Sequence, residues 1–167
     1  MGGVIIKNLN NNMGMSHIRI GRHSVPMIEA YLNAIRDNMG VNLSGSHKWI
    51  GAVKGNDGKI YCVPYHAADI LIIDPATQTA TRSNMGADLS GMWKWQGAVK
   101  GNDGKIYCVP RDAGDILIID PATQTATRSN MGVDLSGFRK WAEAAKGNDG
   151  KIYYVPLEAT DILIISQ

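Results

Sequence analysis

Short apolar stretches separated by polar turns recur along most of this chain, and the same stretch returns every 46 residues. Ile70 to Ile73 is apolar at every position, as expected of a β-strand that is covered on both faces. The preceding stretch, Lys59–Pro64, is almost as apolar, whereas the following one, Thr79–Ser83, is polar and suits an exposed edge. Together with the small residues of Trp49–Lys54, the pattern predicts four strands in each repeat, with the middle ones buried.

Turn signals separate these strands. Asn56-Asp57-Gly58 is typical of a tight hairpin, because glycine accepts the positive φ that other residues resist. Pro75 follows Asp74 in a second turn, where proline presets φ and the carboxylate can accept from backbone amides. No stretch inside a repeat has the length and period of a helix. The repeats are therefore predicted to be all-β.

The period defines three copies, residues 38–83, 84–129 and 130–167. A period of this length indicates a repeat architecture. Buried middle strands beside a polar outer strand describe the blades of a β-propeller, in which four-stranded sheets are set around a channel. The run Asn-Asp-Gly-Lys-Ile-Tyr-Cys-Val-Pro, followed by Asp-Ile-Leu-Ile-Ile-Asp-Pro-Ala-Thr-Gln-Thr, resembles the blade of kelch-like and YVTN-type propellers over residues 49–165. The resemblance implies a fold but does not indicate a particular function, because such propellers serve in binding, scaffolding and catalysis.

Residues 1–37 do not follow the repeat. Val4–Lys7 and His17–Arg22 predict short strands, the second with alternating isoleucines. After Ser24, apolar residues spaced by three and four predict a short amphipathic helix, Pro26–Asp37. We expect this region to supply a closing strand and a helix packed on the outside.

Propellers typically carry four to eight blades, and this chain encodes three. The third copy reaches Gln167 without a counterpart of residues 76–83, so its repeat lacks an outer strand. We expect a homodimer to form a six-bladed ring, in which His17–Arg22 of one chain completes the third blade of the other. Two alternatives stay open: the chain is a fragment of a longer protein, or its N-terminal segment is a divergent fourth blade.

The three copies differ in two loops, one before the first strand and one between the second and third strands. In an up-and-down blade these loops emerge on one face, and loops on a rigid scaffold commonly carry specificity. Drift after duplication is the alternative explanation. The large, polar or aromatic residues in these loops are the candidate ligand-binding residues: His47, Tyr65, His66, Trp93, Arg111, Asp112, Arg139 and Glu158.

A Lys-Trp pair opens the first strand of each repeat. Rings of this size on an inner strand fill the space between blades. The lysines predict either a basic ring at a channel mouth, which would favour anionic ligands, or simple solvated groups. The candidate channel-lining residues are Lys48, Trp49, Lys94, Trp95, Lys140 and Trp141.

Charge and cysteine content limit the partners. The chain has 17 basic and 15 acidic residues, spread evenly, which argues against a nucleic-acid-binding face.

Cys62 and Cys108 are one repeat apart, too far for a disulfide, so we expect two reduced, buried side chains and no metal site. No apolar run is long enough to cross a membrane, and nothing resembles a secretion signal, so a soluble intracellular protein is favoured.

No catalytic motif is present: the sequence has no Gly-x-Ser-x-Gly, no His-Glu-x-x-His and no phosphate-binding glycine loop. We therefore expect a non-catalytic binding or scaffold module without a cofactor, which recognises a protein or carbohydrate through the variable loops. The alternative is a metal-dependent, lactonase-like hydrolase with its site in the channel. In that case the convergent groups would be His47, His66, Asp112 and Glu158.

Overall fold

The computed structural model describes residues 17–20, 23–26 and 34–167. The chain divides into two units, residues 1–36 and 37–167. In the first unit, strand β1 (His17–Ile20) pairs antiparallel with β2 (His23–Pro26). The strand predicted within 17–22 is thus confirmed where it is described, and its role in a partner chain stays a prediction.

The helix predicted at Pro26–Asp37 is wrong at both of its ends. Ser24 and Pro26, expected as the cap and first turn, lie in β2, where they pair with Arg19 and His17. Residues 34–37 are not helical either. A short amphipathic pattern forms a helix only when its apolar face is packed, and here the pairing with β1 extends the residues that should nucleate it. Residues 27–33 and the strand predicted at Val4–Lys7 lie outside the described residues.

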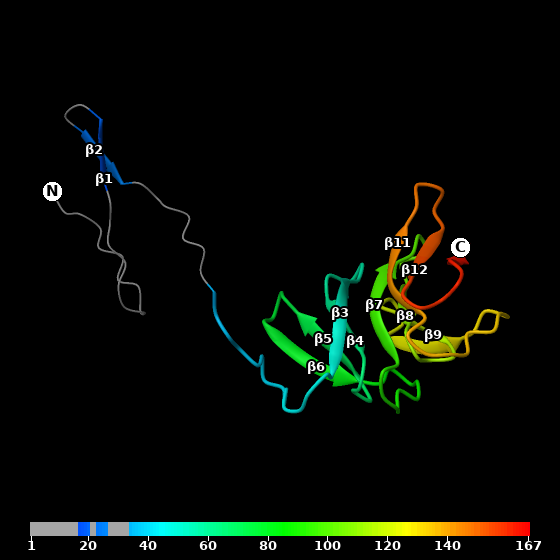
Figure 1. The fold of residues 1–167 in the computed structure, drawn as a ribbon. Coiled ribbons are helices and arrows are strands. Elements are labelled where there is room, and N and C mark those ends of the chain that lie inside the picture. The colour runs from blue at the N-terminus through cyan, green and yellow to red at the C-terminus, as the bar shows by residue number, and fades with distance from the viewer. Residues whose placement is uncertain (1–16, 21–22, 27–33) are drawn as a thin grey trace. The chain divides into compact units, whose positions relative to one another are not determined.

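Three antiparallel sheets, one for each repeat, make up the second unit (Figure 1). We call them blade 1 (residues 38–83), blade 2 (84–129) and blade 3 (130–167). Blade 1 has the strand order β3-β4-β5-β6, formed by Trp49–Lys54, Ile60–Pro64, Ile70–Asp74 and Thr79–Ser83. Blade 2 has the order β7-β8-β9-β10, formed by Trp95–Lys100, Ile106–Pro110, Ile116–Asp120 and Thr125–Ser129. Blade 3 has three described strands, β11-β12-β13, formed by Trp141–Lys146, Ile152–Pro156 and Leu163–Ile165.

The all-β, blade-like architecture expected from the repeat is therefore confirmed, and in blades 1 and 2 every strand begins within one residue of its predicted start. Among the described residues no helix is long and apolar enough to cross a membrane. Closure into a ring and the homodimer stay predictions.

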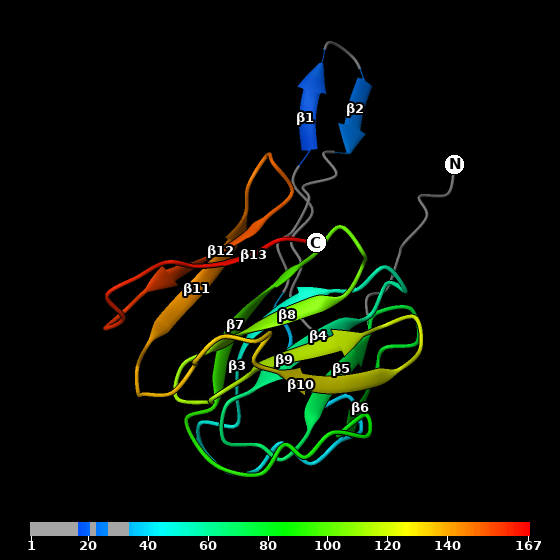
Figure 2. The same cartoon turned by 90° about the vertical axis from the view of Figure 1, so that its right-hand side faces the viewer.

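The middle strands of a blade are apolar on both faces because the blades pack on one another (Figure 2). Val63 and Ile70 of blade 1 share a core with Cys108 of blade 2. On its other face blade 2 places Val109 in a second core with Ile152 of blade 3. Successive side chains of one strand point to opposite faces, so an unbroken apolar run is required wherever both faces are covered.

The two cysteines are free and buried, as expected. Cys108 is fully enclosed in the core between blades 1 and 2, and burial raises the pKa of both thiols. A thiol held in its neutral form is a small apolar side chain here, because the thiolate is the reactive species.

Candidate functional site

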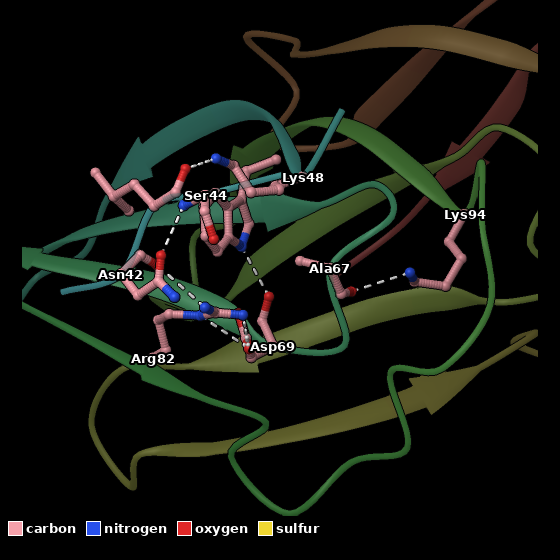
Figure 3. Close-up of polar contacts among 9 residues, drawn as sticks. Asn42, Ser44, Lys48, Ala67, Asp69, Arg82 and Lys94 are labelled. Atoms are coloured by element: carbon pink, nitrogen blue, oxygen red, sulfur yellow. Dashed lines mark hydrogen bonds and ion pairs between the residues drawn. The ribbon is translucent and has the colours of Figure 1, made fainter. Parts of the chain in front are cut away.

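A buried lysine joins each of the later blades to the one before it. In blade 2, Nζ of Lys94 donates to the Ala67 carbonyl of blade 1 at 3.0 Å, as Figure 3 shows. It also donates to the carbonyls of Tyr65 in blade 1 at 3.1 Å and of Gly91 at 2.7 Å. In blade 3, Nζ of Lys140 donates to the equivalent carbonyls of Arg111, Ala113 and Gly137, at 3.0, 3.0 and 2.9 Å. Three carbonyls match the three protons of an ammonium group, so each lysine is fully used inside the protein.

These contacts correct the expectation for two of the three lysines. Lys94 and Lys140 are each 5% exposed, so they are neither solvated nor available as a basic ring. Burial lowers the pKa of Lys94 to about 8, which leaves the group charged at neutral pH. Among the described residues no blade precedes Lys48; its side chain is half-buried and donates to the carbonyl of Leu43. The channel-lining role of these residues stays untested.

The tryptophans beside these lysines are structural, as expected of packing residues. Trp95 and Trp141 lie in the cores between blades. The indole N–H of Trp95 donates to the Asp115 carbonyl at 2.8 Å, and the same contact recurs in blades 1 and 3. Arg128 closes this unit, since its guanidinium stacks over the Trp95 ring at 5.3 Å and bonds the Asp115 carboxylate.

Blade 1 repeats this unit with Arg82 and Asp69, as Figure 3 shows. The sequence analysis does not predict this unit, because the polar outer strand indicates only a solvent-facing role. The signal was present: an arginine and an aspartate recur at matching places in both complete repeats.

Backbone hydrogen bonds hold the two variable loops of each blade together. In blade 1 the amides of Tyr65 and His66 donate to the carbonyls of Lys48 and His47, at 2.9 and 3.1 Å. In blade 2 the amide of Asp112 donates to the Trp93 carbonyl at 3.2 Å. We call the surface made by residues 44–48, 65–69, 90–94, 111–115, 136–140 and 157–161 the loop face. These hydrogen bonds hold the backbone of the loop face in place.

Five of the predicted ligand-binding residues form one aromatic and basic cluster on the loop face. Its centre is Trp93, with ring centroids 4.3 Å from His66, 5.3 Å from Tyr65 and 6.0 Å from His47. Tyr65 and His66 stack on each other at 5.0 Å, and the Arg111 guanidinium lies 5.4 Å from the Trp93 ring. Trp93 is still 41% exposed. These residues come from both loops of blade 1 and both loops of blade 2.

The other three predicted residues continue from this cluster towards blade 3. Arg111 pairs with the carboxylate of Asp112 at 3.1 Å. The second oxygen of that carboxylate accepts from the backbone amide of Arg139 at 2.6 Å. Arg139 in turn pairs with Glu158 at 2.8 Å. All eight candidate residues are therefore linked in one strip across three blades, while their role in binding stays a prediction.

His66 is the unusual titratable group of this strip. Its Nε2 is buried and has no hydrogen-bond partner among the described residues. Burial, with the nearby charges of His47, Lys94 and Arg111, lowers the pKa of His66. A proton on Nε2 would have no acceptor, so the neutral ring is the stable form at neutral pH.

The part of the chain that the structure describes contains no group of three or more His, Cys, Asp or Glu residues that could hold a metal. A hollow on the loop face of blade 3 is lined by residues that include Phe138, Lys140 and Glu158, and it is not lined by Trp93. The arrangement offers apolar and cationic contacts. It offers no converging set of acid, base and metal ligands.

Comparison with known proteins supports the fold. No protein-family model matches this sequence, and no curated protein matches it. The structure is similar to virginiamycin B lyase from Staphylococcus aureus, with a TM-score of 0.52 and 17% identity, over 69% of this chain and 40% of that one. It is also similar to hydrazine synthase from Kuenenia stuttgartiensis, with a TM-score of 0.51 and 13% identity, over 75% of this chain and 35% of that one.

A third similar structure is a protein of unknown function from Bacteroides caccae, with a TM-score of 0.50 and 15% identity, over 71% of this chain and 46% of that one. The chain thus spans less than half the length of these proteins. The repeated antiparallel sheets and these distant likenesses show a β-propeller type of fold. At such low identity the likeness concerns the fold alone.

Proposed function

We propose that this chain is a non-catalytic binding module that recognises a protein partner through its loop face. The observation that carries the proposal is the pre-formed cluster in which Trp93, still 41% exposed, lies beside Arg111 and packs on the buried ring of Tyr65. Tryptophan and arginine are among the residue types that most often dominate the energy of protein interfaces.

The surroundings of the cluster favour a protein over a sugar. Met92 and Phe138, on the same loops, are 64% and 77% exposed, and together with Trp93 they present apolar side chains to solvent. Methionine, aromatic residues and arginine are enriched in the buried centres of protein interfaces. Because the loops are held by backbone hydrogen bonds and by the buried lysines, binding requires little ordering of the backbone.

The test compares Trp93→Ala and Arg111→Ala with the wild-type chain and with Thr123→Ala. Thr123 is exposed in the turn between β9 and β10, at the opposite ends of the strands from the loop face. Proteins captured by the immobilised chain from its source organism would be quantified by mass spectrometry, and the affinity of a purified candidate would be measured by calorimetry. Trp93→Ala should weaken binding by at least about tenfold, whereas Thr123→Ala should bind like wild type.

Two results would overturn the proposal. A purified partner that binds Trp93→Ala as tightly as wild type would show that the loop face does not take part in binding. Specific capture of a glycan on an array, lost in Trp93→Ala, would make the ligand a carbohydrate. Among the described residues no group that could hold a metal supports the lactonase-like alternative. A panel of lactones and esters with divalent metals tests it directly.

A further inference from the structure

Blade 3 presents an apolar face whose counterpart in blade 1 is buried. The face of a blade that meets the next blade is formed by four positions, which we call the outgoing face. In blade 1 these positions are 0 to 6% exposed: Val63, Tyr65, Ile70 and Ile72. In blade 3 the same positions are 47 to 58% exposed: Val155, Leu157, Ile162 and Ile164.

In blade 1 the opposite face, which we call the incoming face, is incompletely buried. In blade 2 this face meets blade 1, and Trp95, Ile106 and Ile119 are each 0% exposed. Their counterparts in blade 1 are only half-buried: Trp49, Ile60 and Ile73. One end of the row of blades therefore presents an exposed outgoing face. The other end presents an incoming face, and at the internal junctions faces of these two kinds bury each other.

We propose that a second copy of this chain covers the outgoing face of blade 3 with the incoming face of its own blade 1, and that two such junctions close a six-bladed ring. Two junctions inside the chain, between blades 1 and 2 and between blades 2 and 3, already use this contact. A head-to-tail interface becomes a closed assembly when its rotation completes a ring, and six blades fall within the usual propeller range.

The polar contacts of the internal junctions specify the register of the new one. At both junctions the lysine that precedes the tryptophan donates to two carbonyls of the previous blade. The counterparts of those carbonyls in blade 3 are Leu157 and Ala159, which accept no hydrogen bond from the described residues. Lys48 of the second copy would donate to them, in the way that Lys94 and Lys140 do within the chain.

A second lysine contact repeats in the same way. Nζ of Lys100 donates to Oδ1 of Asn56 at 2.7 Å, and Nζ of Lys146 donates to Oδ1 of Asn102 at 2.9 Å. The next members of this series are Lys54 on one copy and Asn148 on the other. Apolar burial and two kinds of polar contact thus require the same alignment of the second copy.

The test is the mass of the full chain in solution, measured by light scattering and sedimentation across a concentration series. The wild-type chain should have twice the mass of 18.1 kDa. Ile164→Asp, on the outgoing face, and Lys48→Met, on the incoming face, should each reduce it to the single-chain mass. Thermal unfolding checks that both variants remain folded, because Ile164 is 49% exposed and Lys48 is half-buried within one chain.

Phe138→Asp is the matched control. Phe138 is 77% exposed, and its counterpart Met92 stays 64% exposed although it lies beside an internal junction, so a neighbouring blade does not cover this position. The control should remain a dimer. A wild-type chain that is a single copy throughout, an assembly of three or more copies, or a dimer that survives Lys48→Met would each overturn the proposal.

Discussion

Gly51 of β3 lies against Gly97 of β7 so closely that a Cβ on Gly51 would be 2.7 Å from the Gly97 Cα. Both residues have a positive φ, +86° and +67°, and each lies in a bulge where the inner strand shifts register against its neighbour. The third inner strand has Glu143 at this position. There the residue opposite Val155 is Glu143 itself, so the bulge is shorter.

Gly51→Ala should therefore destabilise the chain strongly, by about 3 kcal/mol, because the methyl group meets backbone that cannot turn away. Gly58→Ala is the control, since Gly58 has a similar φ of +85° but nothing within 4 Å of its added Cβ. Gly58→Ala should lower the free energy of unfolding by only about 1 kcal/mol, which is the cost of holding alanine in the left-handed conformation. Urea unfolding of the two variants measures the difference, and equal losses would show that the contact between the strands is not limiting.

Lys94→Met should lower the free energy of unfolding by about 2 kcal/mol. The side-chain volume stays nearly the same, but the carbonyls of Ala67 and Gly91 lose their donor and the Tyr65 carbonyl keeps only the Lys94 amide. Lys105→Met is the comparison, since that side chain is 43% exposed and lies 4.0 Å from Asp103. It should change stability by less than about 0.5 kcal/mol. If Lys94→Met were as stable as wild type, the buried lysine would not be what holds blade 2 to blade 1.

Tyr154→Phe should stabilise the chain by about 1 kcal/mol. The Tyr154 hydroxyl is buried and bonds to no described residue, and burial strongly raises the pKa of Tyr154. Tyr61→Phe should have the opposite sign and lose about 1 kcal/mol, because the Tyr61 hydroxyl donates to Asp57 at 2.7 Å and accepts from Gln124 at 2.7 Å. Thermal or urea unfolding of this pair gives the test, and a loss in Tyr154→Phe would contradict it.

The depressed pKa of His66 predicts how stability changes with pH. Since the folded state resists protonating His66, the unfolded state binds more protons once the pH falls below the ordinary value of 6.5. Stability should therefore decline as the pH falls from 7 through that value. His66→Gln should flatten this part of the profile while leaving stability above pH 7.5 nearly unchanged. An identical slope in the variant would assign the effect to other groups.

The sequence predicted the strands well because their signals are local. The repeat of Trp49–Lys54 through Thr79–Ser83 and the hairpin at Asn56-Asp57-Gly58 depend on side-chain alternation and on φ, which neighbouring residues determine. The same local pattern was misleading at Ser24 to Pro26. A capping residue and a proline suit a helix start, but pairing with β1 extends this segment instead.

The candidate site was predicted in part. Comparison of the repeats selected the loops, and the eight residues chosen from them are linked in one strip. The burial of Lys94 and Lys140 was not predicted, because a charged side chain on its own predicts solvent. Their burial depends on carbonyls 27 and 29 residues earlier, which only the packing of two blades brings within reach.

By itself the sequence determined the four-strand pattern and the turns, since these depend on residues close together in the chain. It also determined the number of repeats and the positions that vary, since these follow from comparing the 46-residue copies. The tertiary structure decided which side chains meet between periods: the contact of Gly51 with Gly97, the enclosure of Lys94 and the cluster around Trp93. Contacts between repeats depend on how two sheets pack and twist against each other, and that geometry is set by the whole set of side chains rather than by any one segment.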